Sequence, residues 1–146
     1  MAGDRKMRIL VPVDGSDTSL SAVRFVADTL ARASPELEVH LLNVQPPLPS
    51  AAATFIDSAV LRDFHDEEGA KALAAARKLL DDAGVRYVSH AVIGEPAETI
   101  AAYAEQRDCA GITMGTRGLG SAAGLLLGSV AHKVLHLSKV PVTLVK

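Results

Sequence analysis

The chain is poor in cysteine and in aromatic side chains. Among its 146 residues there are one cysteine, no tryptophan and only 3% aromatic residues. A lone cysteine, Cys109, excludes a disulfide framework and a cysteine-rich zinc site. With so few aromatic rings, a stacking platform for single-stranded nucleic acid is not expected. Because 49% of the residues are hydrophobic, the core is expected to consist of Ala, Val, Leu and Ile.

Long apolar runs and an excess of one charge are also missing. No apolar stretch follows the charged start at residues 1–6, so no signal peptide is predicted. The uncharged runs 39–56 and 118–132 contain prolines or are shorter than the roughly 20 residues of a membrane span. A formal net charge of −2 argues against a general nucleic-acid binder. These features predict a cytoplasmic protein with neither a membrane nor a nucleic acid as its partner.

What the sequence contains is an alternation of short apolar runs with longer helical stretches. The patterns predict strands at 8–13, 38–44, 85–93, 110–114 and 140–145, and helices at 17–33, 59–83, 96–106 and 129–137. Ser16 is expected to cap the first helix, and Gly84 to end the second. Apolar strands separated by helices predict an α/β fold, a doubly wound five-stranded parallel sheet with helices on both faces. One domain, residues 1–146, is expected.

Two loops stand out at the carboxyl ends of the predicted strands, where open α/β sheets bind ligands. Asp14-Gly15-Ser16 follows the first strand, and a glycine-rich segment follows the fourth. Six of the eleven glycines lie within residues 111–128, which permits close approach of backbone N–H groups to a ligand. The segment ends at a helix start, Gly128-Ser129, where unpaired amides and the helix dipole favour an anion.

The distribution of charge supports an anion at this place. From Cys109 to the C-terminus there is no Asp or Glu, but there are four basic residues, Arg117, Lys133, Lys139 and Lys146. This segment therefore carries +4, and the rest of the chain, with 11 basic and 17 acidic residues, carries −6. An acid-free, glycine-rich loop with Arg117 at its entrance suits a phosphate chain.

Common nucleotide and hydrolase motifs do not explain the glycine-rich segment. Residues 118–123 have the letters of a dinucleotide fingerprint, but that motif needs an acidic residue about 20 positions later, and none follows Asp108. The P-loop and the nucleophile elbow of serine hydrolases are absent from the sequence. The spacing that does occur is G-x2-G-x9-G-[ST], formed by Gly115, Gly118 and Gly128-Ser129.

Together with V-P-V-D-G-S at 11–16 and V-P-V-T-L-V at 140–145, this spacing strongly resembles the universal stress protein family over essentially the whole chain. The resemblance implies a flavodoxin-like sheet with strand order 3-2-1-4-5, usually a homodimer, and in many members bound ATP. It also implies a nucleotide-dependent stress-response switch or sensor. Since no acid or histidine lies between residues 115 and 130, an efficient enzyme is not expected, and any ATP hydrolysis should be slow.

The resemblance implies a binding site for an adenine nucleotide, residue by residue. Asp14 would accept hydrogen bonds from hydroxyl or amino groups, and the Ser129 hydroxyl would donate to a phosphate. A divalent ion, Mg²⁺, would accompany the phosphates. The adenine and ribose would meet Pro12, Val13, Asp14 and Val44; the ribose and phosphates Met114, Gly115, Arg117 and Gly118; and the terminal phosphates Gly128, Ser129 and Val130.

Simpler structural roles for these residues stay open. Asp14 and Ser129 can cap helices, and Arg117 can be a solvated loop residue. Residues 119–127 carry no charge and include Gly120 and Gly124, whereas family members often have a basic residue there. Weaker binding would follow, and the same fold could be a homodimeric interaction module that has lost nucleotide binding. A slow ATPase or phosphotransferase is the third possibility.

The remaining candidate features predict structure rather than chemistry. His132 and His136 have a spacing compatible with a metal, but no carboxylate or cysteine lies nearby in sequence, so no metal site is expected. The acidic run 66–68 is expected to be a solvated helix face. The strand Val140 to Val145 contains Pro141, which favours an edge strand. Pairing of this edge with its symmetry mate would give a homodimer.

Overall fold

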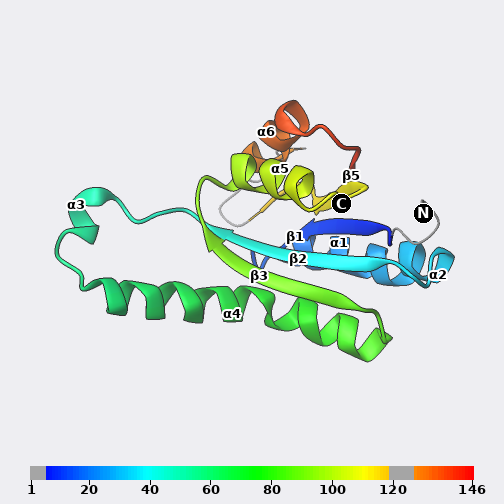
Figure 1. The fold of residues 1–146 in the computed structure, drawn as a ribbon, viewed down its shortest axis with the longest axis horizontal. Coiled ribbons are helices and arrows are strands. Elements are labelled where there is room, and N and C mark those ends of the chain that lie inside the picture. The colour runs from blue at the N-terminus through cyan, green and yellow to red at the C-terminus, as the bar shows by residue number, and fades with distance from the viewer. Residues whose placement is uncertain (1–5, 119–126) are drawn as a thin grey trace.

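The computed structural model describes residues 6–118 and 127–146. Strands and helices alternate along these residues (Figure 1). The strands are β1 (Arg8–Pro12), β2 (Glu38–Gln45), β3 (Tyr87–Ile93), β4 (Gly111–Gly115) and β5 (Val142–Val145). The helices are α1 (Asp17–Phe25), the π-helical η2 (Val26–Leu30), α2 (Ala31–Ala33), α3 (Ser50–Ala53), α4 (Ser58–Ala83), α5 (Pro96–Gln106) and α6 (Ser129–Leu137).

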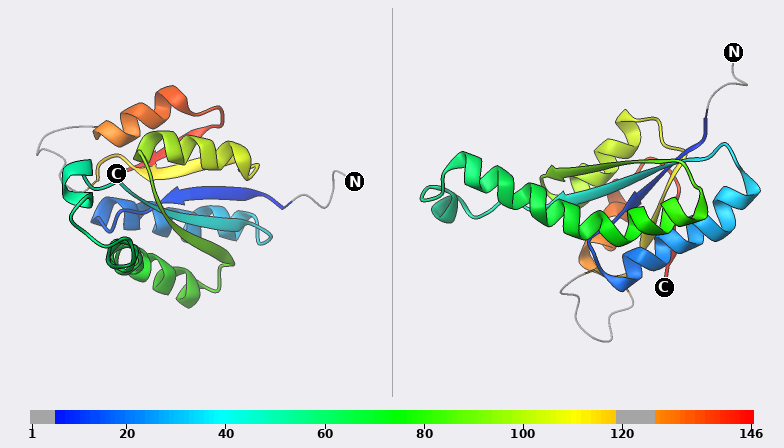
Figure 2. Two further views of the ribbon diagram at one scale, coloured as in Figure 1. Left: turned by 60° about the vertical axis from the view of Figure 1, so that its left-hand side comes forward. Right: turned by 90° about the horizontal axis from the view of Figure 1, so that it is seen from below.

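The strands form one parallel sheet in the order β3-β2-β1-β4-β5. This confirms the predicted doubly wound sheet and its strand order. The chain moves outward from β1 to β3 and then crosses to β4, so the strand order reverses between β1 and β4. Helices α1 and α4 cover one face of the sheet, and α5 and α6 cover the other (Figure 2).

Alternation of side chains along the strands divides the core into two layers. On β1, Val11 packs toward α1 and α4, whereas Leu10 packs toward α5 and α6. On β2, Leu41 and Leu42 alternate in the same way. The next residues, Asn43 to Gln45, alternate in the same way. Their side chains therefore point to opposite faces at the carboxyl end of the sheet.

Helix α4 is longer than the strands it covers. Its 26 residues span about 39 Å at 1.5 Å per residue, whereas the seven residues of β3 span about 23 Å. The last turn of α4 is fixed to the start of β3 through Gly84, which ends the helix in a left-handed conformation as predicted. The extra length therefore extends beyond the carboxyl ends of the strands, as Figures 1 and 2 show.

Several predicted boundaries need correction. The first helix, predicted at 17–33, contains the π-helical turn η2, and the predicted loop 45–58 contains the short helix α3. Pro141 lies before β5 rather than inside it, and its carbonyl oxygen accepts from the Ile112 amide at 2.9 Å. β3 is an edge strand with exposed positions such as Val88.

Two further sequence predictions concern the membrane and the glycine-rich loop. No helix within residues 6–118 and 127–146 combines the length and the apolar character needed to span a bilayer. Gly120 and Gly124, which were expected to loosen the loop after β4, lie outside the described residues.

Candidate functional site

A cavity of about 540 Å³ opens at the carboxyl ends of β1, β2 and β4, where the strand order reverses. This is the position at which doubly wound sheets bind their ligands. Every residue predicted from the family resemblance lines it. They are Pro12, Val13, Asp14, Val44, Met114, Gly115, Arg117, Gly118, Gly128, Ser129 and Val130.

The loop after β1 holds Asp14 in a tight turn. Asp14 Oδ1 accepts from the Ser16 backbone N–H at 2.9 Å, and Gly15 has a φ of +87°, which favours glycine. Ser16 caps α1, since its Oγ accepts from the Ser19 N–H at 3.2 Å. The helix is therefore capped by Ser16, as predicted, and the Asp14 carboxylate lies at the wall of the cavity.

The start of the loop after β4 packs closely against the loop after β1. At Gly118, a Cβ atom would collide with Asp14 Oδ2, so a side chain there would require the Asp14 carboxylate to move. Thr18 Oγ1 donates to the Arg117 carbonyl oxygen at 2.7 Å, which ties this segment to α1. Gly115 also contacts the Thr18 backbone, where a Cβ would be 2.8 Å from the carbonyl carbon. The glycines of this motif therefore let the loops after β1 and β4 pack together as one wall of the cavity.

The N-terminus of α6 forms one end of the cavity. Gly128 is the N-cap residue, its N–H donates to the Thr116 carbonyl oxygen at 2.6 Å, and no side chain caps the helix. Ser129 is the first helical residue, so the alternative that it is the N-cap is wrong. Backbone N–H groups in the first turn of a helix have no intrahelical partner. Ser129, Val130 and Ala131 line the cavity with this turn.

Only part of the predicted basic segment faces the cavity. Lys133 Nζ is 2.7 Å from Glu98 Oε1, and Lys139 Nζ is 3.3 Å from Glu105 Oε1, so both lysines pair with α5. The ion pair with Glu98 raises the pKa of Lys133. Arg117, by contrast, is exposed and lines the cavity. The positive charge at the site therefore comes from Arg117 and the α6 amides.

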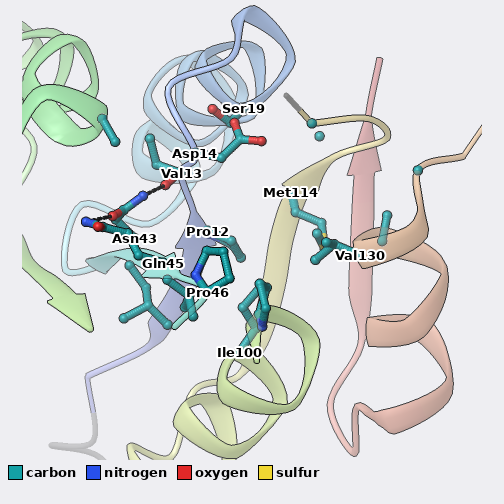
Figure 3. A pocket seen from close by; sticks show the side chains of 18 of the residues that line it. Pro12, Val13, Asp14, Ser19, Asn43, Gln45, Pro46, Ile100, Met114 and Val130 are labelled. Carbon is teal, nitrogen blue, oxygen red and sulfur yellow. Dashed lines mark hydrogen bonds between the residues drawn. The ribbon is translucent and has the colours of Figure 1, made fainter. Parts of the chain in front are cut away.

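One side of the cavity is apolar. Figure 3 shows Pro12, Pro46, Ile100, Met114 and Val130 around it, contributed by β1, the loop after β2, α5, β4 and α6. Flat apolar walls of this kind suit a nucleobase, which has two apolar faces and a polar edge.

The other side is polar, and the sequence prediction missed it. Asn43 Nδ2 donates to the Val13 carbonyl oxygen at 2.9 Å, and Gln45 Nε2 donates to Asn43 Oδ1 at 3.1 Å (Figure 3). Gln45 also contacts α4: its Nε2 is 2.8 Å from the His65 carbonyl oxygen, and its Oε1 is 2.7 Å from His65 Nδ1. This network fixes the first part of α4 against the end of β2.

Two residues of α4 next to this network also line the cavity, Phe64 and Glu68. Glu68 belongs to a solvated helix face, as predicted: its side chain is 44% exposed and lies 3.4 Å from Lys71 Nζ, and it also lines the cavity. The signal that could have found them is the length of the predicted helix 59–83, which exceeds the length of the strands beside it. The helix must therefore extend over one end of the sheet.

The amino ends of the same strands hold a second polar cluster, made of Glu38, His40 and Tyr103. His40 Nε2 donates to Glu38 Oε1 at 2.8 Å, and the Tyr103 hydroxyl donates to His40 Nδ1 at 2.8 Å. Burial lowers the pKa of His40 although the bond to Glu38 opposes this shift. The same bond lowers the pKa of Glu38, and burial raises the pKa of Tyr103.

Arginines and the cysteine surround this second cluster. Arg8 Nη1 donates to the Arg107 carbonyl oxygen at 3.1 Å, and the Arg107 guanidinium lies 5.3 Å from the centre of the Tyr103 ring. Cys109 is buried, and its burial raises the thiol pKa to about 11. Cys109 is therefore a packed thiol at the end of the sheet opposite the cavity.

The described residues contain no group of three or more His, Cys, Asp or Glu side chains arranged to hold a metal ion. The His132 and His136 rings are in contact on α6, with centroids 4.9 Å apart. Asp14 and Glu68 are carboxylates that line the cavity.

Comparison with known proteins agrees with the fold. The model of the universal stress protein family matches residues 6–146. The chain belongs to the universal stress protein family. It is 32% identical to universal stress protein MJ0531 of Methanocaldococcus jannaschii, over 95% of this chain and 81% of that protein. It is 30% identical to universal stress protein YxiE of Bacillus subtilis, over 95% and 98%.

Solved structures of the family have the same fold. Universal stress protein UspA from Lactobacillus plantarum superposes with a TM-score of 0.79 at 25% identity, over 97% of this chain and 99% of that chain. A universal stress protein in complex with cAMP has a TM-score of 0.72 at 27% identity, over 96% and 97%. A universal stress protein from Archaeoglobus fulgidus in complex with dAMP has a TM-score of 0.65 at 25% identity, over 96% and 98%. The predicted family and its flavodoxin-like fold are confirmed.

Proposed function

We propose that this universal stress protein binds an adenine nucleotide, ATP with Mg²⁺, in the cavity at the ends of β1 and β4, and that it acts as a nucleotide-dependent switch or sensor in the stress response. The observation that carries the proposal is the close contact of Gly118 with the Asp14 carboxylate beside the α6 N-terminus. Family members in complex with cAMP and dAMP support the choice of an adenine nucleotide.

The groups that line the cavity suit the successive parts of a nucleotide. The α6 amides, the Ser129 hydroxyl and Arg117 suit the phosphates, since helix N-termini and guanidinium groups bind them well. Asp14 would accept from the ribose hydroxyls. The apolar walls that include Pro12, Val44 and Met114 then suit the adenine.

Mg²⁺ would accompany the phosphates and neutralise part of their charge. Mg²⁺ in nucleotide sites keeps several waters and is held by substrate phosphates with one or two carboxylates. The carboxylates among the lining residues are Asp14, which is assigned to the ribose, and Glu68 on α4. The protein would therefore hold the ion chiefly through the nucleotide.

Binding rather than catalysis is the proposed activity. No acid or histidine occurs in the sequence from Gly115 to Val130, so a general base for water attack on the terminal phosphate is not evident. Slow ATP hydrolysis or phosphotransfer is the alternative. It would be supported by turnover that survives stringent purification and that Asp14→Ala abolishes.

A second alternative is an interaction module of the same fold without a nucleotide. The uncharged sequence from Leu119 to Leu127 favours it, because family members often have a basic residue there. Mass spectrometry of ligand released from protein purified without added nucleotide separates the two. An adenine nucleotide in stoichiometric amount is expected; its absence, together with failure of ATP to bind, would support the module.

We further propose that residues 1–146 form one cytoplasmic domain that associates as a homodimer through the edge strand, predicted at Val140 to Val145 and observed as β5. β5 pairs with β4 on one side and ends the sheet. An open edge strand is a ready template for pairing. Sedimentation should give a dimer, and Thr143→Lys, which places a charge at this edge, should give a monomer. A monomer at all concentrations would contradict the proposal.

A further inference from the structure

We infer that His65 of α4 recognises the exocyclic amino group of the base, and that it sets a preference for adenine over 6-oxo purines. The inference rests on the proposed function, because it assigns a specificity-determining residue within the same cavity. His65 belongs to neither the glycine motif nor the strand ends that identify the family.

The direction of each hydrogen bond leading to His65 is fixed by backbone carbonyl groups, which only accept. The Val13 carbonyl oxygen requires Asn43 to point its Nδ2 toward it, so Asn43 Oδ1 faces Gln45. Gln45 Nε2 donates both to this oxygen and to the His65 carbonyl oxygen. Gln45 Oε1 is therefore the atom 2.7 Å from His65 Nδ1, and Nδ1 must carry the proton.

In the neutral imidazole, the other ring nitrogen then carries a lone pair and can only accept. Within residues 6–118 and 127–146, no protein group forms a hydrogen bond with His65 Nε2. The residue is 6% exposed, and it lines the cavity. A ligand that enters the cavity can therefore supply the missing donor.

The charges at the two ends of the cavity orient a nucleotide. Arg117 and the α6 amides attract the phosphates, whereas the α4 end of the cavity holds Glu68, whose carboxylate pairs with Lys71 at 3.4 Å, and has no net positive charge to attract them. With the ribose at Asp14, the base extends toward the end of β2 and α4. The amino group of adenine is on the six-membered ring, the part of the base farther from the ribose. It therefore points toward the wall formed by Phe64, His65 and Glu68 of α4, here called the α4 wall.

The α4 wall presents acceptors to this edge of the base. Adenine offers an N–H donor at position 6, which matches His65 Nε2. Hypoxanthine and guanine have a carbonyl oxygen there, which would face the Nε2 lone pair. Phe64 packs edge-on against the His65 ring, with centroids 5.5 Å apart, and helps to fix its orientation.

The test compares ATP with ITP, which carries an oxygen in place of the amino group. Calorimetry with Mg²⁺ should show ATP binding to the unmodified protein roughly tenfold more tightly than ITP, as expected for one hydrogen bond and one repulsive pair. His65→Asn should reduce this ratio to roughly twofold or less, because the Asn amide can still donate to Gln45 but nothing replaces Nε2. His136→Asn, on the exposed last turn of α6, is the matched control and should leave the ratio unchanged.

A spectroscopic measurement keeps the inference testable if His65→Asn does not fold. The imidazole ¹⁵N signals of the unmodified protein should show a protonated Nδ1 and an unprotonated Nε2 at His65, and the Nε2 signal should shift with ATP but not with ITP. A doubly protonated ring, a preference for ITP, or a ratio unaffected by His65→Asn would overturn the inference alone. If neither nucleotide binds the unmodified protein, the proposed function itself fails.

Discussion

The two ends of the same parallel sheet carry polar clusters of opposite kinds. At the amino ends, Glu38, His40 and Tyr103 form a chain in which each donor meets a protein acceptor. At the carboxyl ends, a similar chain runs from Val13 through Asn43 and Gln45 to His65, but this last residue lines a cavity. Both clusters contain a buried histidine.

The difference shows how polar groups divide between stability and binding. A buried network that is satisfied within the protein stabilises one conformation, and removing a partner leaves a desolvated group behind. A network in which one atom at a cavity has no hydrogen-bond partner in the protein holds that atom in place for a ligand. Substitutions at the amino ends should therefore change stability without changing affinity, and substitutions at the carboxyl ends that leave the packing intact should do the reverse.

The largest effect is expected from Gly115→Ala. The new Cβ would lie 2.8 Å from the Thr18 carbonyl carbon, so α1 and β4 would have to separate. The free energy of unfolding should fall by about 1–3 kcal/mol, and ATP affinity should fall because the two walls of the site move apart. Urea denaturation and calorimetry measure the two effects.

Gly84→Ala is the matched control. Gly84 also disfavours a side chain, with a φ of +68°, but a Cβ there would have no neighbour within 4 Å. It should cost about 1 kcal/mol of stability and leave ATP affinity unchanged. Equal losses of affinity in both variants would contradict the role given to the contact between β4 and α1.

Asp14→Ala is expected to act almost entirely on binding. It removes a carboxylate that accepts from the ribose hydroxyls in the proposed complex, and bonds to charged groups are worth roughly 1.5–3 kcal/mol, or about tenfold to a hundredfold in affinity. Stability should change less, since Ser16 still caps α1. A variant that is strongly destabilised yet binds ATP normally would contradict this prediction and show that Asp14 acts on stability rather than on binding.

Tyr103→Phe is expected to act on stability alone. It removes the hydroxyl that donates to His40 Nδ1 and leaves that nitrogen buried without its donor. The free energy of unfolding should fall by about 1–2 kcal/mol, whereas ATP affinity should match that of the unmodified protein. A change in affinity would show that the two ends of the sheet are coupled.

The smallest effect is the contribution of His40 to the pH dependence of stability. Because burial lowers its pKa in the folded protein, the unfolded chain binds more protons just below the ordinary value of about 6.5. This contribution is therefore present above that pH and is lost as the pH falls from there toward the folded pKa. His40→Asn should flatten the loss in urea denaturation between pH 7.5 and 5.5, whereas His136→Asn should not. If the free energy of unfolding changed equally with pH in the unmodified protein and in both variants, this assignment would be contradicted.

Local sequence patterns predicted the fold and one half of the site well. Helix α6 begins at Ser129 and ends at Leu137 as predicted, and the two loops singled out after the first and fourth strands both line the cavity. These features depend on signals within a few residues, or on a motif whose spacing reflects close backbone contact.

The α4 wall could not be predicted in the same way. His65 joins Gln45 across 20 residues, and their contact depends on how far α4 extends past β2. Glu68 has the sequence context of a solvated helix face, and only the three-dimensional structure shows that it lines the cavity. The π-helical turn at Val26–Leu30 likewise depends on packing rather than on a local signal.

The central claim is that the cavity beside Asp14 and Gly118 binds an adenine nucleotide, and isothermal titration calorimetry with ATP and Mg²⁺ tests it most directly. The unmodified protein should bind with a stoichiometry of one per chain and an affinity well below millimolar, and Asp14→Ala should weaken this binding by about tenfold or more. No binding to the folded, unmodified protein at millimolar ATP would contradict the claim.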